Sequence, residues 1–406
     1  MRNYKLDSLR GLAAAIVVFH HALHLSNNTV TEQVLLPRLA ELSADQLAAR
    51  LVMSVFSGGV AVYIFFILSG AVLMNSLQRE ERLDIGAAVR FTGRRVLRIY
   101  PAMIVAVIVF ALASHVRLPA EVDAPFTLGE VVTNSLLLTH DVNGATWTLQ
   151  SEMMMVPILL ALALLQRLLG LAALVGYLIW AQTALHFGPP FGGFYLNVAL
   201  MAFGLGALVP TSIARNAVER LPRGSLAGCV AGLVLARFYF PLNDGLGILA
   251  ILCLGAIMVA LLYHDSSPDH VLEHPAPRFL GRISYSLYLS HVLVVFSLFP
   301  VFRDLIGETT IADNHLRWGL LCGVIALLLT LPLAALSEIW FERPFIRLGH
   351  AIFPGRRGHP TGSGDRLSTA VAGQEAKPSV RPFSAESAER GGSASRVVQP
   401  THNASG

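Results

Sequence analysis

The sequence predicts an all-α polytopic membrane protein with about ten transmembrane helices and both termini in the cytoplasm. Hydrophobic residues make up 54% of the 406 residues and charged residues only 14%, whereas a soluble domain carries about a quarter charged residues. The apolar stretches run for roughly 16–24 residues without alternating in polarity, which suits helices that cross about 30 Å of hydrocarbon and does not suit barrel strands. Lys and Arg residues also gather beside alternate ends of these stretches.

Ten apolar stretches are interpreted as membrane spans, because a helix pairs its backbone polar groups internally and so tolerates the bilayer. The predicted spans cover residues 10–26, 58–77, 99–116, 146–165, 168–186, 193–210, 225–241, 244–263, 280–300 and 318–341. The span at 225–241 has the weakest signal because Arg237 lies near its end. A short amphipathic stretch at 131–138 is expected at a membrane interface.

The distribution of positive charge predicts the orientation. When the N-terminus is placed in the cytoplasm, 24 of the 30 Lys and Arg residues fall on cytoplasmic segments and six on outer segments, as the positive-inside rule requires. Residues 1–350 are expected to form one transmembrane domain. Residues 351–406 are rich in Gly, Ser, Pro and charge, and they are expected to be a disordered cytoplasmic tail because they bury too little apolar surface to fold.

Several classes of site are not indicated by the sequence. The cysteines Cys229, Cys253 and Cys322 each lie alone in an apolar stretch, without the spacing of a metal site. No P-loop or dinucleotide fingerprint is present. The net charge of +4 comes from basic residues beside membrane spans, so a nucleic-acid partner is not expected. The sequence therefore predicts no metal and no permanently bound cofactor.

The first span carries ionisable residues at Arg10, His20, His21 and His24. Arg10 and His21 are eleven residues apart, which is almost three helical turns, so both project from one face about 16 Å apart. His24 lies near that face, and His20 is rotated from it by about 100°. Ionisable groups within a span usually face a polar cavity or a partner. The alternative interpretation is that the histidines are hydrogen-bonding groups that pack helices near the outer interface.

An arginine cluster enters the third span from the cytoplasmic side. Arg94 and Arg98 are four residues apart and share a helix face, and Arg95 shares it partly. Guanidinium groups form paired, charge-assisted hydrogen bonds with phosphate. Ordinary anchoring to lipid headgroups explains such a cluster equally well. Ser69 and Gly70 in the second span are most simply small residues at a helix contact.

Glu152 follows Trp147 in the span that enters from the outer side, and it is expected about one and a half turns deep. A carboxylate at that depth needs a partner. His21 lies at a similar depth, so the topology allows the imidazole of His21 to meet Glu152.

The stretch after residue 280 carries a polar stripe, and the residues after the last span include a possible helix stop. The stripe consists of Ser284, Tyr285, Tyr288 and His291. It is compatible with a substrate-lining role and equally with a hydrogen-bonded seam between helices. After the last span, Pro344 follows Glu342 and Arg343, and this proline is expected to end the helix.

Taken in order, these motifs resemble the membrane acyltransferase-3 family, whose members O-acylate cell-surface carbohydrates and related molecules. The resemblance runs from about residue 4 to residue 348. It rests on Arg10 with His21, on Phe65-Phe66-x-Leu68-Ser69-Gly70, on Arg94-Arg95-x-x-Arg98-Ile99-x-Pro101, on Trp147-x-Leu149-x-x-Glu152, and on Ser284-Tyr285-Ser286-Leu287-Tyr288-Leu289 with His291. One departure is Tyr63-Ile64, where many relatives carry an acidic residue before the Phe-Phe pair.

The resemblance implies transfer of an acyl group, often acetyl, from cytoplasmic acyl-CoA to a hydroxyl of a carbohydrate or glycolipid acceptor, in the inner (plasma) membrane of a bacterium. It implies His21 as the catalytic residue, oriented by Glu152. The expected residues for acyl-CoA are Arg10, Arg94, Arg95 and Arg98. The expected substrate-lining residues are Ser69, Trp147, Tyr285, Tyr288 and His291.

Two other functions remain open from the sequence. Helices that carry His, Glu and Arg within the membrane also fit a transporter or flippase, although the paired Gly/Pro-interrupted helices typical of transporters are not evident. An intramembrane hydrolase that uses Ser69 with His21 is a further alternative, although Ser69 lies in no nucleophile elbow. A transporter needs no acyl-CoA, and a hydrolase releases free acid without a second substrate.

Overall fold

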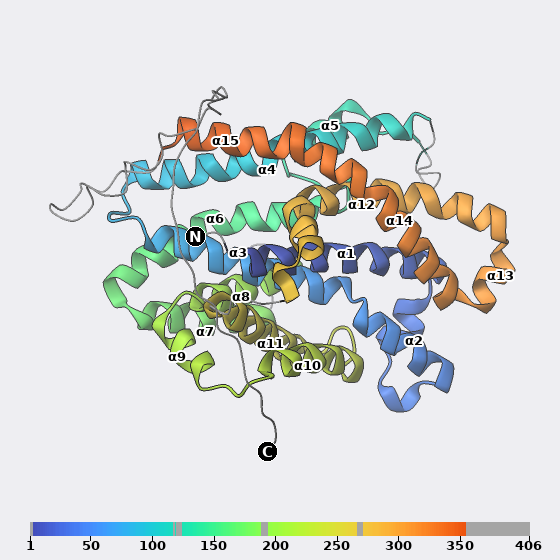
Figure 1. Cartoon of the computed structure of the whole chain (residues 1–406), viewed down its shortest axis with the longest axis horizontal. Helices are drawn as coiled ribbons and strands as arrows, with labels where there is room; N and C mark the ends of the chain where they lie inside the picture. The colour runs from blue at the N-terminus through green and yellow to red at the C-terminus, as the bar shows by residue number, and fades with distance from the viewer. Residues whose placement is uncertain (1–2, 117, 119–123, 188–193, 266–270, 355–406) are drawn as a thin grey trace, which may run out of the picture. The chain divides into compact units, whose positions relative to one another are not determined.

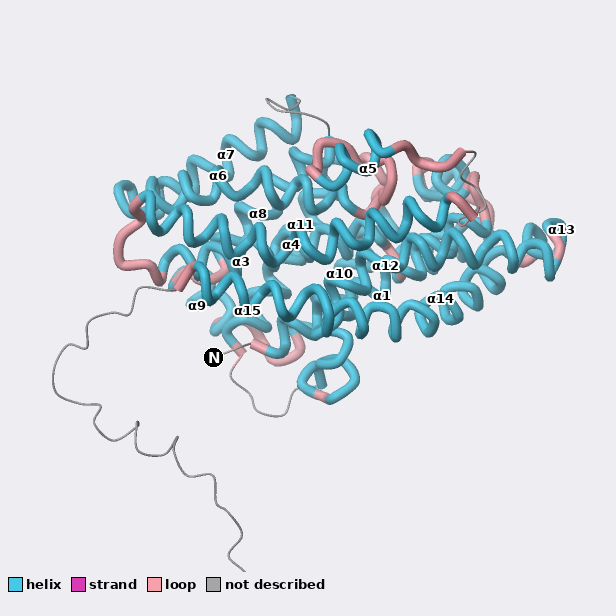
Figure 2. The backbone as a smooth tube through the Cα atoms, turned by 90° about the horizontal axis from the view of Figure 1, so that it is seen from above, coloured by secondary structure: helices cyan, strands magenta, loops and turns pink. Residues whose placement is uncertain are grey.

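The structure is a computed structural model that describes residues 3–116, 118, 124–187, 194–265 and 271–354. Within these residues the chain is helical and contains no strand (Figure 2). The helices are α1 (Tyr4–Ser26), η1 (Thr31–Leu35), η2 (Leu39–Glu41), α2 (Ala44–Val55), α3 (Gly58–Gln78), α4 (Ile85–Ser114), α5 (Leu128–Ser135), α6 (Thr146–Leu169), α7 (Leu171–Phe187), α8 (Phe194–Leu208), α9 (Ser212–Glu219), α10 (Ser225–Tyr239), α11 (Gly245–His264), η3 (Val271–Glu273), α12 (Pro275–Ile306), α13 (Glu308–Asp313), α14 (His315–Ser337), η4 (Glu338–Glu342) and α15 (Arg343–Ile352).

Each of the ten predicted spans overlaps one of these helices, and the all-α fold class is confirmed for the described residues. In that part of the chain, seven segments are long and apolar enough to cross a membrane. They are formed by α1, α2–α3, α4, α6, α11, α12 and α14–α15. α8 and α9 form a bent pair with an angle of 77° between them, and α7 and α10 are shorter apolar helices. The ten-span topology with cytoplasmic termini stays a prediction, and residues 355–406 of the predicted tail lie outside the described residues.

Local sequence signals explain where two of the key helices begin. The side chain of Asn3 accepts hydrogen bonds from the backbone N–H groups of Lys5 and Leu6 and so caps α1. The side chain of Asp84 accepts from the N–H of Ala87 at 2.7 Å, so α4 begins at Ile85. α4 therefore starts well before residue 99, where the predicted span begins, and the arginine cluster lies inside the helix.

α1 lies at the centre of the helical arrangement, packed along α12, α14 and α3 (Figure 1). Gly11 of α1 and Gly281 of α12 allow the closest part of this contact. A Cβ atom on Gly11 would overlap the backbone of Leu280 and Gly281, and a Cβ on Gly281 would overlap the backbone of Asp7. The two backbones thus approach closely at Gly11, the residue that follows Arg10.

A second close contact joins α3 to α8. A Cβ atom on Gly70 would overlap the backbone of Phe203, and one on Gly206 would overlap the carbonyl oxygen of Ile67. The expectation that Gly70 permits a close helix contact is therefore confirmed. Ser69, its neighbour, has a different role that is described below.

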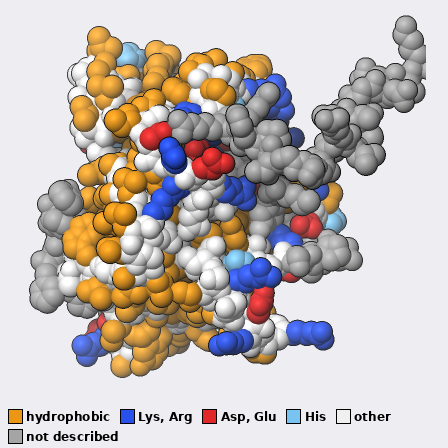
Figure 3. Space-filling model, turned by 90° about the vertical axis from the view of Figure 1, so that its left-hand side faces the viewer, with side chains coloured by type: hydrophobic (Ala, Val, Ile, Leu, Met, Phe, Trp, Pro, Cys, Tyr) orange, Lys and Arg blue, Asp and Glu red, His pale blue; other side chains and the backbone are white. Residues whose placement is uncertain are grey.

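The outward surfaces of several helices are apolar. Large hydrophobic side chains are exposed on α4, α6 and α14, among them Ile108, Leu112, Leu164, Leu168 and Leu328. Figure 3 shows a broad hydrophobic surface, with Lys, Arg, Asp and Glu side chains gathered on a part of that face. Exposed apolar helix faces of this extent suit a lipid environment.

Candidate active site

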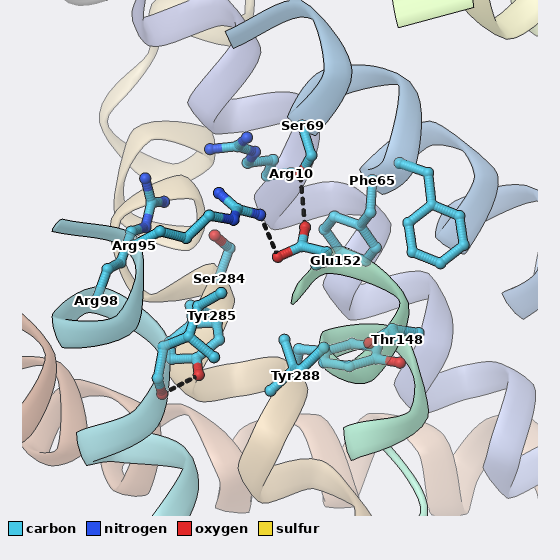
Figure 4. A pocket seen from close by; sticks show the side chains of 13 residues that line it. Arg10, Phe65, Ser69, Arg95, Arg98, Thr148, Glu152, Ser284, Tyr285 and Tyr288 are labelled. Atoms are coloured by element: carbon cyan, nitrogen blue, oxygen red, sulfur yellow. Dashed lines mark hydrogen bonds and ion pairs between the residues drawn. The ribbon is translucent and has the colours of Figure 1, made fainter. Parts of the chain in front are cut away.

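A small polar pocket lies where α1, α3, α4, α6 and α12 meet (Figure 4). Its cavity has a volume of about 70 Å³, which is less than the 300–1,000 Å³ typical of small-molecule sites. The lining residues are Arg10, Phe65, Phe66, Ser69, Arg95, Arg98, Ile99, Thr148, Leu149, Glu152, Ser284, Tyr285 and Tyr288. A large ligand must therefore leave most of its bulk outside this cavity or move the side chains that close it.

The carboxylate of Glu152 occupies the centre of the pocket and is held from two sides (Figure 4). The hydroxyl of Ser69 donates to one carboxylate oxygen at 2.5 Å. The guanidinium of Arg95 donates to the other at 2.6 Å, in an ion pair in which Arg95 is 8% exposed and Glu152 is 16% exposed. This geometry fixes both the carboxylate and the Arg95 side chain.

Two further arginines face the same pocket without a partner of this kind. Arg10 and Arg98 line the pocket, and within the described residues neither forms a hydrogen bond or an ion pair through its side chain. Their guanidinium groups repel one another; Arg10 is attracted to Asp7 and Glu152, and both arginines are attracted to Glu342. The pocket lining itself carries three guanidinium groups and one carboxylate, which favours an anionic or electron-rich ligand.

Tyr285 and Tyr288 of α12 form one wall of the pocket. Tyr285 donates its hydroxyl to the carbonyl oxygen of Ile99 at 2.6 Å, which ties α12 to α4. The Tyr288 ring lies 5.6 Å from Phe65 and 5.5 Å from His291, measured between ring centroids. Tyr288 therefore connects the pocket to a histidine that lies outside the lining.

A series of side-chain ring contacts runs from Tyr288 of α12 to the histidines of α1. His291 is fully buried, its Nδ1 lies 2.6 Å from the Tyr288 carbonyl oxygen, and its Nε2 has no hydrogen-bond partner among the described residues. The His291 ring lies 5.2 Å from the His21 ring. His21 in turn lies 5.6 Å from His20, which lies 4.3 Å from His24.

The comparison with protein families matches the acyltransferase-domain model to residues 3–336. The chain belongs to the acyltransferase-3 family. The match covers every residue that lines the pocket, and it confirms the resemblance seen in the sequence. With its apolar helices, this acyltransferase-3 member is a multi-pass membrane protein. No curated protein and no solved structure was found to match the chain.

In this acyltransferase-3 protein the predicted meeting of His21 and Glu152 is wrong. Both carboxylate oxygens are taken by Ser69 and Arg95, and in the described part of the chain the ring contacts of His21 are with His20, His291 and Phe296. Equal depth in a membrane does not make two side chains neighbours when another helix, here α4, supplies a closer charge. Because Ser69 donates to Glu152, the structure does not pair it with His21 as a hydrolase would require.

The arginine cluster divides into two groups. Arg95 and Arg98 face the pocket, whereas Arg94 lies outside the lining and contacts Glu80 at 3.4 Å. Glu80 also pairs with Arg90 at 3.0 Å, so Arg94 belongs to a separate charge cluster. The four-residue spacing of Arg94 and Arg98 therefore does not bring both side chains to the pocket.

Arg10 and His21 both face α12, as their spacing predicts. Arg10 shares the pocket with Tyr285 of α12, and His21 contacts His291 of α12. The two predicted lining residues Trp147 and His291 stand one layer behind the pocket. Trp147 packs edge-on against Phe66 at 5.9 Å between centroids, and Phe66 lines the cavity.

Two residues at or beside the pocket, Glu342 and Thr148, were not predicted from the sequence. Glu342 is buried, accepts a hydrogen bond from the Ser286 hydroxyl at 3.2 Å, and interacts electrostatically with Arg98 and Arg10. The available signal was an acid at the end of the last predicted span. Thr148 lies beside Tyr288 in the pocket (Figure 4), one turn before Glu152. In the described residues, no group of three or more His, Cys, Asp and Glu side chains is placed to hold a metal ion.

Proposed function

We propose that the protein is an integral membrane O-acyltransferase of the bacterial inner membrane. It moves an acyl group, with acetyl as the first one to test, from cytoplasmic acyl-CoA to a hydroxyl of a cell-surface carbohydrate or a related glycosylated molecule. Family membership supports the class of reaction. The observation that carries the donor assignment is the convergence of Arg10, Arg95 and Arg98 on one cavity, with only Arg95 held in an ion pair.

The two unpaired guanidinium groups are proposed to bind the donor. Guanidinium binds phosphate oxygens through paired, charge-assisted hydrogen bonds. Because the cavity holds about 70 Å³, the nucleotide of CoA stays at its mouth, where Arg98 and Arg10 reach its phosphates. The thin pantetheine arm then passes inward along the Tyr288 wall. Arg95, held by Glu152, is proposed to position the pocket rather than to bind phosphate.

His21 is proposed as the catalytic residue; its ring contacts His291, which in turn contacts Tyr288 of the pocket. A neutral imidazole takes the proton of the acceptor hydroxyl as its oxygen attacks the thioester carbonyl. The C–S bond then breaks, and the CoA thiolate receives the proton from the imidazolium. In the alternative route the imidazole attacks the thioester first, the C–S bond breaks, and the CoA thiolate takes the proton that the acylated imidazole loses. The acceptor hydroxyl then attacks the acyl-histidine, the N–acyl bond breaks, and the hydroxyl proton returns to the imidazole.

The test uses the purified protein in nanodiscs with radiolabelled acetyl-CoA and a crude envelope-glycan fraction. The wild type is expected to bind acetyl-CoA and to transfer label to glycan. His21→Ala is expected to keep binding and to lose transfer by at least about 100-fold, which is the scale of a general base. Arg98→Gln is expected to weaken acetyl-CoA binding. His140→Ala, which changes an exposed loop histidine, serves as the matched control and keeps wild-type transfer.

Unimpaired transfer by His21→Ala would refute the assignment of the catalytic residue. Label that stays on the wild-type protein in the absence of glycan, and is missing from His21→Ala, would select the acyl-histidine route. Failure to bind acetyl-CoA or any longer acyl-CoA would refute the donor and favour a transporter.

A further inference from the structure

A polar groove lies at the end of the bundle where α1 ends, separate from the pocket around Glu152. It has a volume of about 280 Å³ and is formed by the last turn of α1, the segment that leads into η1, the end of α12, α13 and the start of α14. Its polar side chains include Asn28, Gln33, Arg303, Glu308 and His315. Figure 1 places α13 at this end of the helices, away from the labelled N-terminus.

Ser26, Asn27 and Thr29 of this groove form local hydrogen bonds, whereas in the described part of the chain its other polar side chains do not. Within the described residues, the side chains of Asn28, Gln33, Arg303 and Glu308 form no hydrogen bond or ion pair. The Nε2 atom of His315 is buried and has no hydrogen-bond partner among those residues. A buried polar atom without a partner is costly and calls for an explanation.

The mixture of groups distinguishes between classes of ligand. Arg303 offers only donors, Glu308 offers only acceptors, and the amides of Asn28 and Gln33 offer both. Sugar hydroxyls also donate and accept, so they satisfy such a mixture. A phosphate group carries negative charge that Glu308 repels, and an apolar ligand leaves these groups unpaired. Phe299 closes the inner side of the groove, where it is 4% exposed.

On both α1 and α12, the groove begins about one helical turn beyond the level of His21. On α1, Leu25 lines the groove and follows His21 by four residues. On α12, Phe296 contacts the His21 ring at 6.0 Å between centroids, and Phe299, three residues later, lines the groove. At 1.5 Å per residue these steps are about 5–6 Å along each axis.

We infer that this groove binds one sugar unit of the acceptor at the end of the α1–α12 contact, about one helical turn from His21. The inference rests on the proposed function and adds to it a binding site and a ligand class, an uncharged polyhydroxylated ring. The volume of about 280 Å³ lies just below the usual range of small-molecule sites, so it admits one ring rather than a length of glycan chain. Donor and acceptor then approach His21 from opposite ends of α1.

The first test measures transfer of label from acetyl-CoA while the concentration of the envelope-glycan fraction is varied. Arg303→Ala and Gln33→Ala are expected to raise the half-saturating glycan concentration at least about tenfold and to leave that of acetyl-CoA unchanged. Arg317→Ala is the matched control, because this exposed arginine at the same end lies over the Trp318 ring at 5.3 Å and outside the groove. Unchanged glycan dependence in both groove variants would overturn the inference.

The second test does not depend on transfer. A fluorophore is attached at Ala312→Cys, an exposed position of the groove, in a chain whose three native cysteines are replaced by alanine. The labelled protein is titrated with glucose, galactose, rhamnose, N-acetylglucosamine and sodium phosphate. A saturable signal with at least one sugar is expected, with none from phosphate, and Arg303→Ala is expected to remove it. A response to phosphate alone, or to none of the probes, would overturn the inference. A sugar response in a protein that transfers no label would keep the groove as a sugar site and refute the acyltransferase reaction.

Discussion

The Arg95–Glu152 pair decides how the pocket is arranged at the scale of single residues. The carboxylate accepts from Arg95 at 2.6 Å and from Ser69 at 2.5 Å, and both charged side chains are largely removed from solvent. Removing one partner of such a pair leaves an uncompensated charge in a low-dielectric interior, and that is more costly than removing both. The pair is therefore expected to behave as one energetic unit.

We expect Arg95→Met and Glu152→Gln each to lower the free energy of unfolding. The loss for Arg95→Met is expected to be about 3–5 kcal/mol, because this change leaves the Glu152 carboxylate buried without its positive partner. The double variant is expected to lose at least about 1 kcal/mol less than the sum of the two single losses, since residues in contact are coupled. Denaturant unfolding in mixed micelles measures all four proteins. Strict additivity would contradict the ion pair.

The exposed pair Arg215–Glu219 supplies the matched control for this cycle. Its two side chains are 65% and 56% exposed and lie at an i,i+4 spacing on α9. Such surface pairs couple by only about 0.3–0.5 kcal/mol. Arg215→Met and Glu219→Gln are therefore expected to give nearly additive losses under the same conditions.

Residue types and spacings predicted most members of the pocket, but not their partners. The depth of Glu152 along its span follows from its place in the sequence, and the need for a partner follows from its charge. Which neighbour supplies that partner depends on how α4 packs against α6, and Arg95 is 57 residues away along the chain. For the same reason the four-residue spacing of Arg94 and Arg98 did not reveal that Glu80 draws Arg94 away from the pocket.

At the scale of elements, the contact between α1 and α12 sets the position of both Arg10 and His21. Gly281 faces the backbone of Asp7 so closely that a Cβ atom would overlap it. Gly281→Ala is expected to push the helices apart, to lower the free energy of unfolding by about 1–3 kcal/mol as overpacking does, and to reduce transfer. Thermal unfolding and the labelled acetyl-CoA assay measure the two effects.

Gly176→Ala is the matched control for this substitution, because a Cβ atom at Gly176 in α7 meets no other atom within 4 Å. The same change there is expected to be neutral, or stabilising by up to about 1 kcal/mol through helix propensity. Equal losses from both substitutions would show that the close α1–α12 contact has no special energetic role.

The long apolar helices follow from composition and length, whereas the short helices do not. α2, α9 and α13 have 12, 8 and 6 residues, too few for a hydropathy pattern to distinguish them from loops. α15 was missed because Pro344 was expected to end the preceding helix. Instead a π-helical turn at Glu338–Glu342 leads directly into α15, and Pro344 occupies its first turn, where the missing N–H costs nothing.

At the scale of the whole molecule, the distribution of Lys and Arg residues can be used to test the number of membrane spans. Ten spans place 24 of the 30 Lys and Arg residues inside. If only the seven longest segments crossed the membrane, the last of them would end outside, and the same count over the sequence would give 16 inside and 14 outside. A split that even is at odds with the positive-inside rule, so charge favours spans for α7, α10 and the bent α8–α9 pair as well.

Single exposed cysteines at positions 81, 140, 219 and 313 test this topology in a chain without its native cysteines. Ten spans place Glu81→Cys and Glu219→Cys inside, and His140→Cys and Asp313→Cys outside, so in intact cells an impermeant maleimide is expected to label only the second pair. Seven spans would move position 313 inside, because α7 to α10 would then make no crossings. Eight spans, with α8–α9 as one crossing, would move position 219 outside. The pattern of labelling at these two positions thus separates the three topologies, and it also decides whether the groove at α13 faces the outer side of the membrane, as an extracytoplasmic acceptor requires.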